Sequence, residues 1–486
     1  MTAPHKLFRA SSLTFAISAT FLTFAAYSAG KWFQDSRQSV RRVANDQRTQ
    51  LAQAGQRALT PARTSALRTR NTEAEKRLRA AAGTFAQVHD LVRSEYVDVV
   101  PSEQVLSHGA VRAMLSSLED EQSYFVTASD RLVFDAEGEG RFAGIGAITA
   151  IRGAKTKNGY TELRLIVVAP LPESPAARTG LRTGDRITHL DGRYVLGDNP
   201  YLTPNKLPKP VPGPLPAEAS QEGDDLPIQD GIGLLVAQMQ LRQGTAGTHT
   251  VIVQRPGVAK PLRFVVPNAQ TAAPRLVVRH EKATGKSATY LRVGAFTEGM
   301  RSEFASVLQN ASPGESIVLD LRQNAGAGSL NVAERIAANL LSTSEPFAIE
   351  IGAGGKRTPL PLPIKDLAKE KRPVSVLIDG GTAGFAEALA IRLADGGATI
   401  VGTGRTWGDG RSQTLYPLPD GSAFTLTTGR LVSPKGTAWE QVGLAPRVVL
   451  PGDMSEADTV ARAVAVAGRT GSASLATSVP TREAIR

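Results

Sequence analysis

The spacing of hydrophobic residues changes along this chain, and each change predicts a different kind of element. Phe85, Val88 and Leu91 recur at helical spacing, and two further short helices are expected around Pro101. The sequence therefore predicts a small helical subdomain over residues 84–137.

Runs of β-branched residues begin near Gly140 and alternate with turn residues up to about residue 270. A short helix after Pro175 and a longer one at about 233–243 interrupt them. Within this region, eight prolines fall between residues 200 and 227. Such a composition cannot pack a core, so we expect an extended insert over 198–230 in a domain of residues 138–270.

After Pro274 strands and helices alternate, which indicates an α/β layer with a mixed sheet. The expected strands are 288–296, 316–322, 374–380, 398–404 and 422–433, and the expected helices are 329–341 and 383–397. We place this core at residues 274–470 and expect the small, polar tail of 471–486 to be disordered. The predicted class for the whole chain is α/β (α+β).

The amino-acid composition excludes several classes of function. Hydrophobic residues make up 41% and charged residues 21% of the 486 positions, so a sizeable core is possible. The chain has no cysteine, which excludes disulfides, thiol catalysis and thiolate metal sites. Its six histidines are scattered and never paired at ligand spacing. We therefore expect neither a metal site nor a cofactor.

The net charge of +11 belongs to one segment. Residues 31–80 hold twelve Lys or Arg against four Asp or Glu, a local +8 that leaves +3 for the remainder. This distribution argues against a nucleic-acid-binding domain and favours a basic helical linker over 31–83 beside an anionic surface such as a membrane.

The N-terminal segment of residues 1–30 supports the membrane interpretation. The 21 residues between Arg9 and Lys31 carry no charge, and as a helix they would reach about 31 Å, enough to cross a bilayer core. We expect a signal anchor, with a cleaved signal peptide as the alternative. The basic residues after the segment outnumber those before it, which by charge counting alone favours a cytoplasmic body. Long domains are translocated regardless of such charges, so we expect a cell-envelope protein, either anchored in the inner membrane or periplasmic.

Residues 138–270 resemble a PDZ domain of the kind found in bacterial processing proteases. The matching features are the loop Phe142-Ala143-Gly144-Ile145-Gly146, the block from Ser174 to Gly192 and the helix near 233–243. The resemblance implies that the loop offers backbone N–H groups to a terminal carboxylate while the peptide adds as a strand beside the helix. Phe142, Ala143, Gly144, Ile145 and Gly146 are thus the expected peptide-binding residues.

Residues 84–450 as a whole are similar to the C-terminal-processing (tail-specific) serine peptidases. The family's strand-and-turn motif, which helps to form an oxyanion hole, corresponds to Gln323-Asn324-Ala325-Gly326-Ala327 here. This turn lacks the family's proline and its last glycine. The catalytic segment and the closing strands match in the order that the family has them.

The resemblance also implies a Ser–Lys dyad, and both of its positions hold other residues. Laid on the family pattern without gaps, the serine position is Gly384 and the lysine position 25 residues later is Asp409. The family's supporting glutamine and glutamate are retained as Gln413 and Glu387. Glycine cannot attack a carbonyl, so we expect no intact catalytic dyad.

Two functional hypotheses follow. The first is a catalytically inactive envelope protein that binds protein C-termini or a partner protease. The second is an active serine-type endopeptidase with an altered site, either through Thr382 and an unidentified base or through a water activated by Asp409.

Overall fold

The computed structural model describes residues 61–155, 161–196, 229–283 and 285–467. The expected signal anchor, most of the basic linker, most of the proline-rich insert and the C-terminal tail lie outside these residues. The chain divides into two compact units, residues 1–102 and 103–486. Each unit is described here by itself.

The described part of the first unit is one long helix, α2 (Pro61–Glu95). This helix runs without a break through residue 83, where we expected the basic linker to give way to the helical subdomain. Phe85, Val88 and Leu91 follow the predicted helical spacing, and each is just over half exposed. None of the helices within the described ranges is both long and apolar enough to span a bilayer.

The second unit starts with two helices and a short strand: α3 (Glu103–Ser116), β1 (Phe125–Val126) and α4 (Ala128–Gly138). Thr127 caps α4, because its hydroxyl accepts the N–H of Asp130. β1 pairs antiparallel with a strand almost 300 residues later, so that Phe125 faces Phe424. The N-terminal part of this unit is therefore tied to the C-terminal part of the chain.

A seven-stranded sheet with two helices follows, and we call it the sheet domain (residues 141–272). Its sheet order is β3-β4-β5-β6-β7, with β8 paired to β5 and β9 to β8, while short β2 pairs with β10. The elements are β2 (Arg141–Phe142), β3 (Ala147–Lys155), β4 (Thr161–Pro170), α5 (Pro175–Thr179), β5 (Arg186–Leu190), β6 (Arg193–Leu196), β7 (Gln229–Gly233), α6 (Leu234–Arg242), β8 (Thr248–Gln254), β9 (Leu262–Pro267) and β10 (Thr271–Ala272). Its own hydrophobic core includes Ile145, Leu165 and Leu241. Strand β3 lies at an edge of this sheet.

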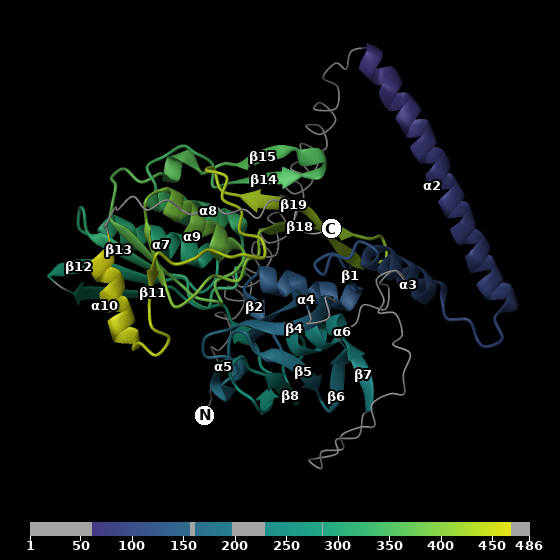
Figure 1. Ribbon diagram of the computed structural model, residues 1–486, viewed down its shortest axis with the longest axis horizontal. Coiled ribbons are helices and arrows are strands. Elements are labelled where there is room, and N and C mark those ends of the chain that lie inside the picture. Colours follow the sequence, from purple (N-terminus) through teal and green to yellow (C-terminus); the bar gives the residue numbers. More distant parts are fainter. Residues whose placement is uncertain (1–60, 156–160, 197–228, 284, 468–486) are drawn as a thin grey trace, which may run out of the picture. The chain divides into compact units, whose positions relative to one another are not determined.

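The remaining chain is built on a six-stranded sheet of order β11-β12-β13-β16-β17-β20 (Figure 1). The strands from β12 to β20 are parallel to one another, and β11 is antiparallel at the edge. Its strands are β11 (Val277–Ala283), β12 (Lys286–Arg292), β13 (Ser316–Asp320), β16 (Val374–Ile378), β17 (Thr399–Gly402) and β20 (Val448–Val449). The helices are α7 (Glu298–Asn310), α8 (Leu330–Leu340), α9 (Phe385–Asp395) and α10 (Glu456–Val466).

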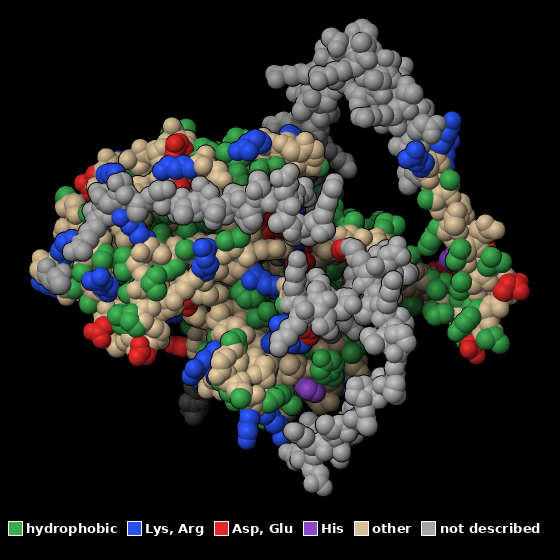
Figure 2. All heavy atoms as spheres, in the orientation of Figure 1, with side chains coloured by type: hydrophobic (Ala, Val, Ile, Leu, Met, Phe, Trp, Pro, Cys, Tyr) green, Lys and Arg blue, Asp and Glu red, His purple; other side chains and the backbone are tan. Residues whose placement is uncertain are grey.

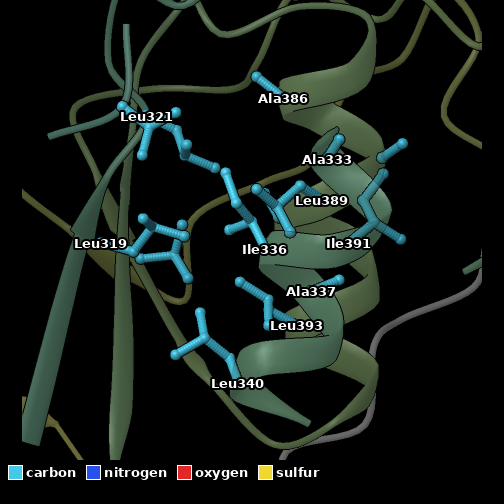
Figure 3. Close-up of a cluster of buried hydrophobic side chains, with 14 of the residues drawn as sticks. Leu319, Leu321, Ala333, Ile336, Ala337, Leu340, Ala386, Leu389, Ile391 and Leu393 are labelled. Carbon is cyan, nitrogen blue, oxygen red and sulfur yellow. The ribbon is translucent and has the colours of Figure 1, made fainter. Parts of the chain in front are cut away.

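The two faces of this sheet bury different helices. Alternate residues of β13 belong to different cores, Leu319 to the core with α7, α8 and α9 and Val318 to the core with α10. Figure 3 shows Leu319 and Leu321 pointing at Ile336 of α8 and Leu389 of α9. This two-sided burial explains why β13 and β16 are hydrophobic without alternation.

A second sheet of this region has the order β1-β19-β14-β15, with β18 also paired to β19. Its strands are β14 (Ala348–Gly352), β15 (Arg357–Leu360), β18 (Arg411–Pro417) and β19 (Ala423–Val432), and short 3-10 turns lie at Ala353–Gly355 and Ile364–Asp366.

On the face drawn in Figure 2, basic and acidic side chains are interspersed.

Candidate active site

Gly384 stands where a buried strand turns into a helix. Strand β16 ends at Ile378, and Gly384 precedes the first residue of α9 with φ 53° and ψ −120°. A positive φ is costly for residues other than glycine, and a strained strand-to-helix turn is also how α/β-hydrolases present a nucleophilic serine. The turn therefore has a geometry suited to a nucleophile, on a residue without a side chain.

Gly384 and Asp409, which lie 25 residues apart in the sequence, face each other. A Cβ atom placed on Gly384 would lie 4.0 Å from Oδ2 of Asp409 and 3.6 Å from the backbone oxygen of Ala325. All three contacts of that Cβ are ordinary van der Waals distances. The space around position 384 could thus hold a small side chain directed at residue 409.

Asp409 is linked to Gln413 through a third residue. Nε2 of Gln122 donates to Oδ1 of Asp409 at 3.2 Å, and Oε1 of Gln122 accepts Nε2 of Gln413 at 2.7 Å. Gln122 precedes Asp409 by 287 positions and has no motif around it. Gln122 could not be identified as a site residue from the sequence, because only the pairing of β1 with β19 brings the segment of Gln122 to the site.

Glu387 holds the backbone on both sides of the site. This fully buried carboxylate accepts the N–H groups of Gly384 (3.2 Å), Gly408 (2.6 Å) and Asp409 (2.7 Å), and also the hydroxyl of Thr406. Burial raises the pKa of Glu387 to about 7, and these donors together lower it less than burial raises it. Glu387 therefore fixes the distance between the α9 start and the loop of Asp409.

The turn at residues 323–327 packs directly against the start of α9. Ala383 donates its N–H to the backbone oxygen of Asn324 at 2.9 Å, and Gly326 has φ 80°. A Cβ on Gly326 would come within 2.8 Å of the oxygen of Ala383. The N–H of Gly326 donates to Oδ1 of Asn324, so this amide is already used within the turn.

Thr382, the alternative nucleophile, is built into the backbone of the turn. Its side chain is fully buried, its hydroxyl donates to the oxygen of Leu321 at 2.9 Å, and Asp379 donates its N–H to the same hydroxyl at 3.1 Å. The nearest upstream lysines, Lys369 and Lys371, are exposed ahead of β16. The described structure brings no lysine or histidine into hydrogen bonding with Thr382.

The sheet domain contacts the loop of Asp409 through Arg152. The guanidinium lies 3.8 Å over the ring of Trp407 and donates to the backbone oxygen of Trp407 at 2.5 Å. Burial lowers the pKa of Arg152, while the negative charges of Glu387 and Asp409 oppose this shift. A second contact joins Thr183 to Gln323, whose Oε1 lies 3.0 Å from the Thr183 hydroxyl.

The expected carboxylate-binding loop of residues 142–146 is engaged inside the sheet domain. Gly144 donates its N–H to the oxygen of Gly244 at 2.7 Å, and Ile145 donates to the oxygen of Leu241 at 3.0 Å. Phe142 pairs with a residue of β10, Ala143 is half-buried, and Gly146 packs against Ser174. In this conformation the amides of Gly144 and Ile145 are not free to bind a carboxylate, because the backbone oxygens of Gly244 and Leu241 already accept them.

A metal centre does not emerge from the described ranges, where no three His, Asp or Glu side chains are placed to share an ion. The site consists instead of the buried carboxylate of Glu387, the partly exposed carboxylate of Asp409 and the backbone of two glycine-containing turns. The model of peptidase family S41 matches residues 287–450, a range that includes Gly384, Glu387 and Asp409. Residues 287–450 are a peptidase family S41 domain.

Relatives match well beyond the S41 domain itself. The chain is 26% identical over 367 residues to the carboxy-terminal processing protease CtpB of Bacillus subtilis, a match that covers 75% of this chain and 66% of that protein. It is 29% identical over 380 residues to a carboxy-terminal-processing protease of Bartonella bacilliformis, covering 76% of this chain and 75% of the relative. The chain is thus homologous to carboxy-terminal-processing proteases.

A solved structure supports the fold. The photosystem II D1 C-terminal processing protease superposes with a TM-score of 0.57 at 21% identity, covering 78% of this chain and 92% of the other. The matched 78% of this chain therefore has the fold of that protease.

Proposed function

We propose that this chain is a non-hydrolytic relative of the carboxy-terminal-processing proteases, held at the cell envelope, that binds protein C-termini through a PDZ-like sheet domain. The observation that carries the loss of hydrolysis is the pair Gly384 and Asp409. The backbone is shaped for an attacking side chain, yet residue 384 has none and the group facing it is a carboxylate.

Peptide binding is supported by the edge strand β3. Nε2 of Gln238 on α6 donates to the backbone oxygen of Thr149 on β3 at 2.7 Å. The backbone N–H and C=O of Thr149 therefore point toward α6 and away from β4. A peptide strand that entered between β3 and α6 could pair with those groups once Gln238 moved aside. The edge of β3, rather than the loop at 142–146, is then the main source of affinity.

Hydrolysis is tested directly. The purified chain is incubated with an unfolded polypeptide and with a serine-directed covalent probe, and we expect neither cleavage nor labelling. Cleavage by the unaltered chain that disappears in Thr382→Val, while the variant remains folded, would support the altered-site endopeptidase instead. The double variant Gly384→Ser/Asp409→Lys restores both reacting groups, and its activity would show that the turn still supports the reaction.

Binding is tested with fluorescent peptides that carry either a free or an amidated C-terminus. Thr149→Pro removes the outward N–H of the strand edge, whereas Thr149→Val keeps it, and a proline is tolerated at an edge. We expect tight binding of the free-carboxylate peptide to be lost in the proline variant alone. Equal affinity of both variants, with both folded, would rule out strand addition at β3. Binding only to an active homologue and not to peptides would indicate a partner protease.

Localisation is tested separately by fractionation of cells that produce the full chain. We expect the protein in the membrane fraction, accessible to protease from the periplasmic side. Release into the soluble cytoplasm would contradict the proposed envelope location without affecting the other two proposals.

A further inference from the structure

Gln238 is a polar residue on the buried side of α6. The other buried residues of this helix are apolar: Leu234, Ala237, Met239 and Leu241. Gln238 is only 7% exposed, although glutamine is mostly found at protein surfaces. A buried carboxamide needs a hydrogen-bond partner, so its contacts indicate what holds it there.

The partner of Gln238 is the free edge of strand β3. Its Nε2 donates to the backbone oxygen of Thr149 at 2.7 Å. β3 pairs with β4 on one side, and no strand in the described part of the chain pairs with its other side. The carboxamide of Gln238 therefore lies on the edge to which a further strand would add.

An added strand and the carboxamide of Gln238 need the same space. Neighbouring strands lie about 4.8 Å apart, which puts the N–H nitrogen of an added strand about 2.9 Å from the oxygen that it binds. Nε2 of Gln238 already lies 2.7 Å from the oxygen of Thr149 on the same side of β3. A peptide strand can therefore pair with Thr149 only after this side chain has left.

We propose that Gln238 occupies the peptide-binding edge of the free protein and that a peptide binds by displacing it. The inference rests on the proposed function, because it concerns the regulation of strand addition at β3. Breaking the bond to Thr149 offsets part of the free energy gained from the new backbone hydrogen bonds. Gln238 thereby lowers the affinity for all peptides and protects an open sheet edge from pairing with arbitrary extended chains.

The test measures peptide affinity and binding rates with the full chain. The probe is a fluorescein-labelled octapeptide with a free C-terminus, selected from a randomised library for binding to the unaltered chain. Gln238→Ala should bind it about fivefold more tightly, because one neutral hydrogen bond no longer has to be broken. The gain should appear in the association rate. The dissociation rate should not change, since Gln238 has already left the edge in the complex of the unaltered chain.

Gln240→Ala is the matched control. Gln240 lies on the same helix, is half-buried and makes no side-chain hydrogen bond within the described residues, so this variant should bind the peptide like the unaltered chain. If Gln238→Ala does not fold, Gln238→Met keeps the length of the side chain and removes its donor, and it should also bind more tightly.

Three outcomes would contradict the inference. Equal affinity of the unaltered chain and the Gln238 variants would overturn it and leave strand addition at β3 intact. A gain confined to the dissociation rate would also overturn it, because it would come from new contacts in the complex. If no peptide of the library binds to any of the variants, the proposed strand addition fails, and the role of Gln238 fails with it.

Discussion

The guanidinium of Arg152 lies 3.8 Å over the ring of Trp407, two residues before Asp409. The sheet domain thereby touches the loop that carries one half of the candidate site. The same guanidinium donates to the backbone oxygen of Trp407, so both stacking and hydrogen bonding hold the loop.

Arg152→Lys should destabilise the protein by about 1 kcal/mol, because lysine keeps the charge but cannot stack as a plane. Urea unfolding measures the change. Arg164→Lys on the neighbouring strand β4 is the control, since Arg164 forms an ion pair in the described structure with Glu162 of the same strand. Equal effects of the two substitutions would mean that the stacking on Trp407 contributes nothing.

Gly384→Ser should cost about 1 kcal/mol of stability, because serine must adopt a positive φ at this position. The cost does not come from a clash with neighbouring residues, since an added Cβ has ordinary contacts with them. Gly109→Ser is the matched control, because Gly109 lies in α3 with open space around it. Denaturant unfolding of both variants decides the point: a loss of several kcal/mol for Gly384→Ser would show that the turn has no room.

Glu387 should make stability fall as the pH rises from about 4.5 to 7. The pKa of Glu387 is raised to about 7 in the folded protein, so the folded state binds the proton more tightly than the unfolded state. The shift is worth at most about 3 kcal/mol. Glu387→Gln should be less stable at every pH, because an amide nitrogen cannot accept the loop N–H groups, and should lose this pH slope. An unchanged slope in the variant would assign it to other groups.

Two buried threonines should respond differently to the same substitution. Thr382→Val removes a hydroxyl that donates to Leu321 and accepts from Asp379, so we expect a loss of about 2 kcal/mol. Thr149→Val removes a hydroxyl that has no partner in the described structure and should be neutral or slightly stabilising. Thermal unfolding compares them, and similar melting temperatures would show that the Thr382 hydroxyl is not structural.

Local sequence pattern was enough for the elements that surround the site. The expected strand at 374–380 and helix at 383–397 appear as β16 and α9. Both could be predicted because the hydrophobic run of a strand buried on two faces and the periodicity of a helix each occupy only about ten consecutive residues. The mixed α/β class follows from the same alternation and is confirmed by the likeness to a solved protease.

Contacts between distant segments could not be predicted in this way. Gln122 reaches Asp409 only because β1 pairs with β19, and no local pattern encodes that pairing. The amides of Gly144 and Ile145 looked available in the sequence, since their acceptors, Gly244 and Leu241, lie about 100 residues later, at and just after the end of α6. The contact of Gln238 with Thr149 likewise becomes visible only when α6 is in place beside β3.

The carboxylate of Glu387 ties both halves of the site together without needing a nucleophile or a base. Folding and reactivity therefore depend on different atoms here. Cells remove proteins that unfold, so the proposed loss of the attacking hydroxyl and of its base would not by itself lead to degradation. Measurements of expression or solubility would therefore not distinguish the proposed non-hydrolytic chain from a working hydrolase.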